Sequence, residues 1–207
     1  MIRVAIEKKL QGYAGAGVLK VQHEFPTGSI TAIHGPSGAG KTTLLKIIAG
    51  LTSADSGTVT VDEKPWLDTN QNINLSPQQR RVGFVFQDYA LFPNMSVIQH
   101  LGYATNDKDW INRLLQLGKL ENLTTHKPAY LSGGQQQRLT ILRALAIKPS
   151  IILMDEPFSA LDRGTKTDLI NNLNGVLKAL NATVLIVTHN PEELSGIYTK
   201  ELYISGI

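Results

Sequence analysis

The sequence predicts an α/β fold with a mainly parallel central sheet, an antiparallel β edge and a small inserted helical subdomain. Strand-like and helix-like segments alternate along most of the 207 residues, as they do in parallel sheets covered by helices. The run SIILMDEP at residues 150–157 begins with the near-continuous apolar character of a strand buried on both faces. Residues 2–7 and 18–25 alternate apolar and polar side chains, which is typical of half-buried antiparallel strands.

The other elements of the main domain follow in chain order. Residues 29–35 read as a strand that runs into a glycine-rich loop, and residues 41–50 as a helix that ends at Gly50. Further strands are expected at residues 57–63, 81–87, 182–189 and 200–206. Helices are expected after Ser132, from Arg163 to Leu180 and, briefly, from Pro191.

The helical subdomain is expected at about residues 96–146, inserted into a single domain that spans residues 1–207. Short helical segments are predicted there at residues 95–104, 109–118 and 120–123. Neither an internal repeat nor a long linker interrupts the chain. One α/β core with a small helical lobe is therefore the predicted organisation.

Composition limits the classes of function. Apolar residues make up 42% of the chain, which is ordinary for a globular protein. The net charge is +3 without a concentrated basic block, so no nucleic-acid partner is expected. The chain has no cysteine, which is compatible with a reducing cytosol. It has no apolar run of signal-peptide or membrane-spanning length, so any membrane role is expected to be peripheral.

The glycine-rich loop GPSGAGKT matches the phosphate-binding pattern G-x-x-x-x-G-K-[ST] in full. Glycines allow backbone N–H groups to wrap around phosphate oxygens, and the helix that follows adds its positive N-terminal end. Lys41 can reach the β and γ phosphates, and the Thr42 hydroxyl can bind Mg²⁺. A chance glycine turn is the alternative, but the loop lies between a predicted strand and a predicted helix. The predicted nucleotide-binding residues are Gly35, Pro36, Ser37, Gly38, Ala39, Gly40, Lys41, Thr42 and Thr43. We therefore predict a P-loop NTPase.

Two adjacent acids at the end of the apolar run supply the second half of a nucleotide site. Asp155 can hold Mg²⁺, and Glu156 is placed to orient or deprotonate an attacking water. Such a pair is often only a helix cap with a solvated neighbour. Because a full P-loop occurs in the same chain, the catalytic interpretation is preferred.

Other nucleotide-binding classes fit less well. A GTPase should carry an Asn-Lys-x-Asp motif, and NDKD at residues 106–109 does not match it. A small-molecule kinase has no need for the serine-glycine turn LSGGQQQR at residues 131–138.

Six motifs in order make the chain resemble the ATP-binding subunit of ABC transporters from end to end. They are GPSGAGKT, FVFQDYALFP, LSGGQQQR, LMDEP, SALD and VTHN. The resemblance implies a homodimer in which the P-loop of one subunit faces the serine-glycine turn of the other. Two ATP molecules, with Mg²⁺, would lie between the two subunits.

The resemblance also assigns roles to single positions. It implies that Ser132, Gly133 and Gly134 bind the γ-phosphate of the partner's ATP. Gln87 would contact Mg²⁺ and the attacking water, and His189 would contact the γ-phosphate and stabilise the transition state. Asp162 would lie in the loop at the dimer interface, beside the nucleotide. Each position also has a purely structural alternative. The Ser132 turn could be only a capped helix start, Gln87 a polar strand end, His189 a structural histidine and Asp162 part of a helix-start turn.

Adenine is usually stacked on an aromatic residue near the start of such chains. Tyr13 is the best candidate, because a ring face can stabilise a stacked base. The spacing of QGYAGAG does not match the usual one, and a tyrosine in a hairpin turn is the competing interpretation.

The region around Gln87 resembles subunits of oxyanion importers, most of all those for molybdate. This implies a peripheral position at the cytoplasmic face of the cell membrane and an indirect link to a substrate-binding protein. Many such subunits carry a C-terminal regulatory domain; this chain stops soon after YISGI, so none is expected. A soluble ABC ATPase with a non-transport role and a non-hydrolysing ATP-dependent module are the alternatives.

A membrane permease is expected to bind the loop after Gln87. Tyr89, Leu91, Phe92 and Met95 place several large apolar side chains in a loop, where they would be exposed to water. The segment Tyr89–Met95 is therefore predicted to form a groove for a short permease helix. The alternative is that these side chains fold back under the helical lobe.

Overall fold

The computed structural model describes residues 1–12, 15–194 and 196–205. Its strands form two five-stranded sheets. The parallel sheet has the order β10-β3-β9-β8-β7. Its strands are β3 (Ile30–His34), β7 (Gly83–Val85), β8 (Ile151–Asp155), β9 (Thr183–Val187) and β10 (Lys200–Tyr203). The predicted parallel sheet is therefore present.

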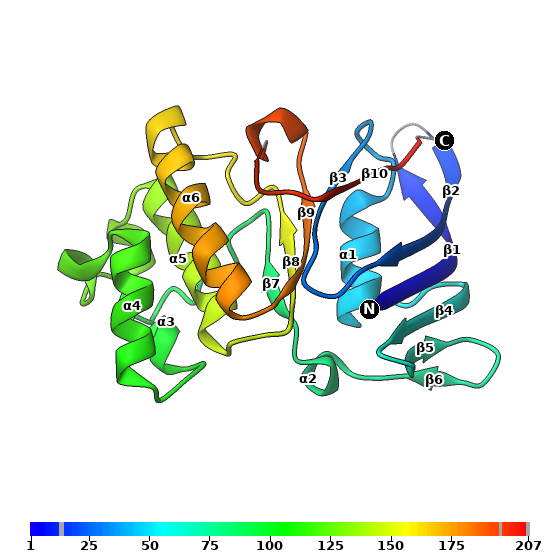
Figure 1. Ribbon diagram of the computed structural model, residues 1–207, viewed down its shortest axis with the longest axis horizontal. Helices are drawn as coiled ribbons and strands as arrows, with labels where there is room; N and C mark the ends of the chain where they lie inside the picture. The colour runs from blue at the N-terminus through cyan, green and yellow to red at the C-terminus, as the bar shows by residue number, and fades with distance from the viewer. Residues whose placement is uncertain (13–14, 195, 206–207) are drawn as a thin grey trace.

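The second sheet is antiparallel and has the order β2-β1-β4-β5-β6. Its strands are β1 (Ile2–Gly12), β2 (Gly15–Phe25), β4 (Ser56–Val61), β5 (Lys64–Asp68) and β6 (Ile73–Asn74). The predicted α/β fold class is confirmed, and its antiparallel part forms a separate sheet beside the parallel one (Figure 1).

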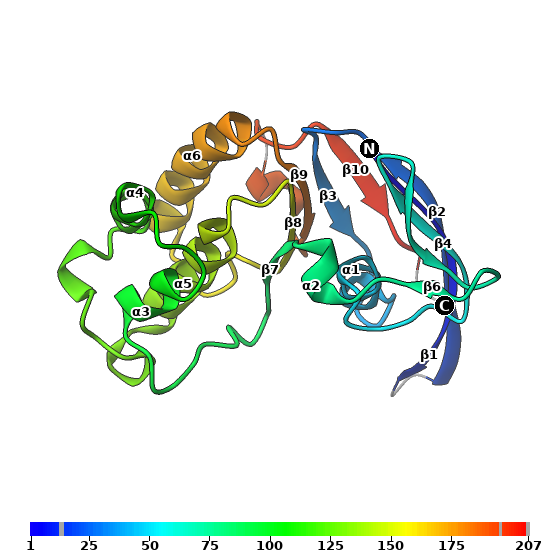
Figure 2. The same ribbon diagram turned by 90° about the horizontal axis from the view of Figure 1, so that it is seen from below.

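Helix α1 (Lys41–Ala49) lies between the two sheets (Figure 2). Its Leu44, Leu45, Ile47 and Ile48 are fully buried in one apolar cluster with residues of both sheets. On the other face of the parallel sheet, a second cluster joins α3 (Val97–Gly102), α4 (Lys108–Gly118), α5 (Gly133–Ala146) and α6 (Arg163–Ala179).

Strand β8 shows why its sequence is continuously apolar. Ile151 and Leu153 belong to the α1 cluster, while Ile152 and Met154 belong to the cluster with α3–α6. Since side chains of a strand alternate between faces, both faces of β8 are buried. Its acidic end, Asp155, lies at the carboxyl edge of the sheet.

Short elements complete the fold. They are α2 (Pro77–Arg80) and the 3₁₀ turns Glu121–Leu123, Pro128–Tyr130 and Pro191–Leu194. Strands β5 and β6 and helix α2 were not predicted, because each is short and lacks a clear apolar period. Within the described residues, no helix has both the length and the apolar character that crossing a bilayer requires.

Arg80 joins α1 to the antiparallel sheet. Its side chain is 4% exposed and donates to five oxygens, which lie on the α1 end, β5 and the β6 region: those of Ile47, Ile48, Trp66, Asn74 and Leu75. Burial lowers the pKa of Arg80 to about 10. The Ile47 and Trp66 carbonyls also accept from the Gly50 and Leu75 N–H groups, whereas the Ile48 carbonyl, which has no partner within the helix, is satisfied by this guanidinium.

Candidate functional site

The P-loop connects β3 to α1, as predicted. Gly35, Gly38 and Gly40 have φ of 147°, 81° and 92°, a region that disfavours residues with a Cβ. A Cβ on Gly35 would stand 2.1 Å from the Ile204 carbonyl oxygen, so only glycine fits there. Gly40 is also the N-cap of α1 and brings no capping side chain, which leaves the first N–H groups of the helix available to an anion.

Lys41 lies inside this loop. Its side chain is buried, and Nζ donates to the carbonyl oxygens of Gly35 (2.8 Å) and Pro36 (2.9 Å). The charged amine is therefore held where the loop backbone would surround phosphate oxygens.

Asp155 and Thr42 lie together with Gln87 around one cavity of about 620 Å³. Three segments that are far apart in the sequence therefore meet: the start of α1, the end of β8 and the residues after β7. The three residues predicted as metal ligands line this single space. Lys46 and Asp88 also line it and were missed by the sequence analysis.

Asp155 has the environment of a cation ligand. It is 3% exposed, and Oδ1 has no hydrogen-bond partner among the described residues. Burial raises the pKa of this carboxyl, while the Thr42 hydroxyl opposes that shift. A buried carboxylate oxygen without a partner, beside a hydroxyl, fits Mg²⁺, which prefers oxygen ligands.

Glu156 and His189 form a close pair beyond Asp155. His189 Nε2 lies 2.7 Å from Glu156 Oε1. The pair borders a second cavity of about 200 Å³, which Ser159, Lys166 and Glu193 also line. Lys166 and Glu193 form an ion pair at 2.8 Å. Two of the four residues predicted to be catalytic, which also include Gln87 and Lys41, are thus brought together at the carboxyl edge of the sheet.

The serine-glycine turn begins α5. Ser132 and Gly133 are exposed. Ser132 Oγ accepts from the Gln135 N–H at 3.3 Å, and the Ser132 N–H donates to Gln135 Oε1 at 2.8 Å, a reciprocal capping box. Since the cap uses Oγ only as an acceptor, its hydroxyl hydrogen remains able to donate.

The serine-glycine turn and the P-loop open helices on opposite sides of the parallel sheet. Helix α1 contributes to one apolar cluster and α5 to the other, and both views show the sheet between them (Figures 1 and 2). Neither the cavity at Asp155 nor the cavity at His189 is lined by Ser132.

Asp162 lines neither of the two cavities. Asp162 is exposed and caps α6, where Oδ1 accepts from the Thr165 N–H at 3.0 Å. That backbone N–H lowers the pKa of the Asp162 carboxyl. The prediction for Tyr13 lies outside the described residues.

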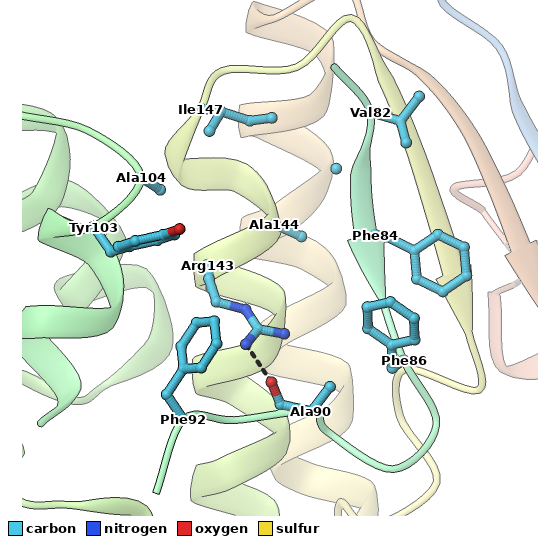
Figure 3. Close-up of a pocket in the computed structure, with 11 residues that line it drawn as sticks. Val82, Phe84, Phe86, Ala90, Phe92, Tyr103, Ala104, Arg143, Ala144 and Ile147 are labelled. Carbon is cyan, nitrogen blue, oxygen red and sulfur yellow. Dashed lines mark hydrogen bonds between the residues drawn. The ribbon is translucent and has the colours of Figure 1, made fainter. Parts of the chain in front are cut away.

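An apolar groove of about 530 Å³ opens beside the residues that follow Gln87 (Figure 3). We call it the Phe92 groove. It is lined by Val82, Gly83, Phe84, Phe86, Ala90, Phe92, Tyr103, Ala104, Arg143, Ala144 and Ile147. Phe92 is 41% exposed and Tyr103 72%. Leu91, in contrast, packs against the core, so the predicted segment is partly folded back.

Arg143 shapes this groove. Its guanidinium donates to the carbonyls of Ala90 at 2.5 Å and Tyr89 at 3.2 Å, and lies 5.7 Å from the centre of the Phe92 ring. Tyr89 and Ala90 both have positive φ, which residues with a Cβ rarely adopt. In this backbone conformation both carbonyls face the Arg143 guanidinium. The loop between the Asp155 cavity and the groove is therefore held by α5.

Comparison with known families agrees with this geometry. The family model described as "ABC transporter" matches residues 18–159, more than half of the chain. The chain belongs to the ABC transporter family. The P-loop, the acidic strand end and the serine-glycine turn described above all lie within the matched residues.

Curated import ATP-binding proteins resemble the chain over most of its length. It is 43% identical over 186 residues to the sulfate/thiosulfate import ATP-binding protein CysA of Vibrio vulnificus, covering 84% of this chain and 52% of that protein. It is 40% identical over 196 residues to the molybdenum import ATP-binding protein ModC of Haemophilus ducreyi, covering 94% of this chain and 55% of that protein. The chain thus spans about half the length of the curated relatives it matches.

Solved structures of an ABC transporter cassette share the whole fold. The dimeric structure of the bacterial cassette MJ0796 superposes with a TM-score of 0.83 at 31% identity, covering 99% of this chain and 94% of that one. A post-hydrolysis state of the same cassette, bound to ADP and Pi, gives a TM-score of 0.82.

Proposed function

We propose that this chain binds and hydrolyses ATP as one half of a homodimer, and that the dimer drives a membrane permease. Two ATP molecules, each with Mg²⁺, would lie between the P-loop of one copy and the Ser132 turn of the other. The subunit would sit peripherally at the cytoplasmic face of the cell membrane, with no nucleic-acid partner.

One observation carries the proposal of a shared site. The P-loop and the Ser132 turn open helices on opposite sides of the parallel sheet, and Ser132 lines neither the Asp155 cavity nor the His189 cavity. Both are nevertheless anion-binding helix starts with free N–H groups. A second copy can bring its exposed Ser132 turn to the P-loop of the first, whereas one copy has only half of such a site.

The residues of one copy have different roles in ATP binding and hydrolysis. Lys41 and the loop N–H groups hold the β and γ phosphates, and Asp162 lies at the interface. Thr42, Asp155 and Gln87, which line one cavity, would hold Mg²⁺, and the ion would neutralise phosphate charge. Glu156 takes the proton of the attacking water, while the water oxygen bonds to the γ-phosphorus and ADP leaves. His189, 2.7 Å from Glu156, orients that carboxylate and contacts the γ-phosphate.

The Phe92 groove is the proposed contact with the permease. Its walls are mainly apolar and include an aromatic anchor, which suits the apolar face of a short helix. The groove is joined to the Asp155 cavity by the loop that holds Gln87, since Phe86 and Ala90 line both. Closure around ATP would therefore move residues that line the groove.

An oxyanion such as molybdate is the proposed cargo of the permease, delivered by a substrate-binding protein that does not touch this chain. The support is the resemblance to relatives named for sulfate/thiosulfate import and for molybdenum import. The cargo itself would pass through the permease.

Purification from membranes tests the proposal. The native chain should co-purify with an integral-membrane permease, and deleting its gene should reduce uptake of radiolabelled molybdate more than that of sulfate. Phe92→Asp should keep ATP binding and dimerisation but lose the permease and uptake. Tyr203→Asp, at an exposed aromatic outside the groove, is the matched control.

Two results would contradict parts of this proposal. Normal uptake by the Phe92→Asp variant would exclude the groove as the permease contact. Recovery of the chain with no membrane protein, with both oxyanions still taken up in the deletion strain, would favour an ATPase without a transport role.

A further inference from the structure

A buried amide joins helix α5 to the backbone of Glu156. Gln137, on α5, is 1% exposed. Its Nε2 donates to the Glu156 carbonyl oxygen at 2.9 Å and, more weakly, to Ser159 Oγ at 3.5 Å, and its Oε1 accepts from the Ala160 N–H at 2.7 Å. One side chain therefore spans the whole turn that follows β8.

The orientation of this amide is fixed by its two backbone partners. A carbonyl oxygen can only accept and a backbone N–H can only donate, so the flipped amide would lose both bonds. Asparagine is one methylene too short to span the same two groups. Glutamine is thus the amide side chain that satisfies both ends.

Glu156 is held in an unusual conformation. Its φ is 49°, in the left-handed region that residues with a Cβ rarely adopt. Its N–H donates to the Val187 carbonyl at 3.0 Å, and its carbonyl accepts from Gln137 and from the Ser159 N–H and hydroxyl at 3.3 and 3.2 Å. Because φ sets the direction of the Cα–Cβ bond, these contacts decide where the carboxylate points.

We propose that Gln137 is a positioning residue for hydrolysis. It keeps the Glu156 backbone in its left-handed conformation and so holds the carboxylate beside His189, where it can act on the attacking water. The inference rests on the role proposed for Glu156 as the base. Since Gln137 lies on the helix that begins at Ser132, the element that would contact the partner's ATP also fixes the base of its own copy.

Two substitutions separate the two bonds of the amide. Gln137→Met keeps a similar volume and removes both bonds. Gln137→Glu retains an acceptor for the Ala160 N–H but loses the donor to the Glu156 carbonyl. Thr140→Val is the matched control on the same helix: its hydroxyl is fully buried and bonds to the carbonyls of Gln136 and Tyr89, the second of which also accepts from Arg143.

The measurements are kcat, KM for ATP, ATP affinity and the melting temperature of each purified variant. Both Gln137 variants should lower kcat by about 10- to 100-fold, the effect of a misplaced reacting group. ATP affinity should change by less than about twofold, because the P-loop is untouched. Thr140→Val should keep its kcat.

Combination with Glu156→Gln distinguishes positioning from general stability. If Gln137 acts through the Glu156 carboxylate, adding Gln137→Met to Glu156→Gln should change the residual rate by less than about twofold. A purely structural role would lower the rate by the same factor in both backgrounds and would overturn the inference.

The remaining outcomes are equally decisive. Normal kcat in both Gln137 variants, with Glu156→Gln inactive, would overturn the inference alone. Normal turnover by Glu156→Gln would instead reject Glu156 as the base, and with it the proposed mechanism. Failure of both Gln137 variants to fold, while Thr140→Val folds, would show that the contact serves stability only.

Discussion

His189 Nε2 lies 2.7 Å from Glu156 Oε1, although the two residues follow different strands. Strands β8 and β9 are parallel neighbours, with Asp155 opposite Val187, so the residues after each strand meet at the same edge. The Glu156 N–H also links the ends of the two strands, because it donates to the Val187 carbonyl at 3.0 Å. The sheet register thus places a carboxylate and an imidazole where a water could be oriented between them and a phosphate.

Lys41→Ala should weaken ATP binding and abolish hydrolysis. A hydrogen bond to a charged group contributes about 1.5–3 kcal/mol, so the Kd for ATP should rise ~10- to 100-fold. Fluorescence titration and phosphate release measure the two effects. Lys178→Ala, at an exposed lysine near the end of α6, is the control. Near-normal turnover by Lys41→Ala would contradict the P-loop assignment.

Asp155→Asn should separate stability from activity. Because burial raises the pKa of Asp155, the folded chain holds that proton more tightly than the unfolded chain does. The free energy of unfolding of the nucleotide-free protein should therefore fall as pH rises through the range where this carboxyl ionises. The variant should lose that pH dependence.

The same variant should lose its response to Mg²⁺. Hydrolysis should drop by about 100-fold or more, as when a charge-stabilising group is removed from an active site. Urea melts at several pH values and rates at several Mg²⁺ concentrations give both readouts. An unchanged Mg²⁺-dependent rate would exclude Asp155 as a ligand.

Arg80→Met should lower the free energy of unfolding without altering the residues proposed to bind and hydrolyse ATP. The substitution leaves the buried Ile48 carbonyl without its donor and removes one of two donors from the Ile47 and Trp66 carbonyls, at a cost of about 1–3 kcal/mol. The urea midpoint should fall accordingly. Arg81→Met alters the neighbouring exposed arginine and should change the free energy of unfolding by less than about 0.5 kcal/mol. Equal midpoints for the two variants would contradict the role given to Arg80.

Ser132→Arg should block dimerisation and turnover while each monomer still binds ATP. The substitution puts a bulky cation at the exposed start of α5, which packs on the opposite side of the parallel sheet from the P-loop helix of the same copy. When Ser132→Arg and Lys41→Ala subunits are mixed, a mixed dimer has one intact site, so activity should reappear. As the control, Ser132→Arg subunits are mixed with the Lys41→Ala/Ser132→Arg double variant, because that mixed dimer has no intact site and should stay inactive. Loss of ATP binding by Ser132→Arg monomers would argue against action in trans.

Much of the site could be predicted because its parts are local. The P-loop is one continuous strand–loop–helix segment, and Asp155 ends a strand whose apolar run is obvious. The meeting of Gln87 with Thr42 and Asp155 was implied only by resemblance, because it depends on strand order. Gln137 and Lys46 were missed, since a polar side chain on a helix gives no sign of its partner. Strands β5 and β6 were missed because short strands are fixed by tertiary pairing.

The most direct test of the account is the oligomeric state of Glu156→Gln, measured by size-exclusion chromatography with light scattering. The variant keeps the shape of the side chain but loses the base, so ATP should join two copies without being cleaved. We expect a monomer without nucleotide, a stable dimer with Mg²⁺ and ATP, and a monomer again when the Ser132→Arg substitution is added to the same chain. A Glu156→Gln variant that binds ATP yet remains strictly monomeric at saturating ATP would contradict the shared site.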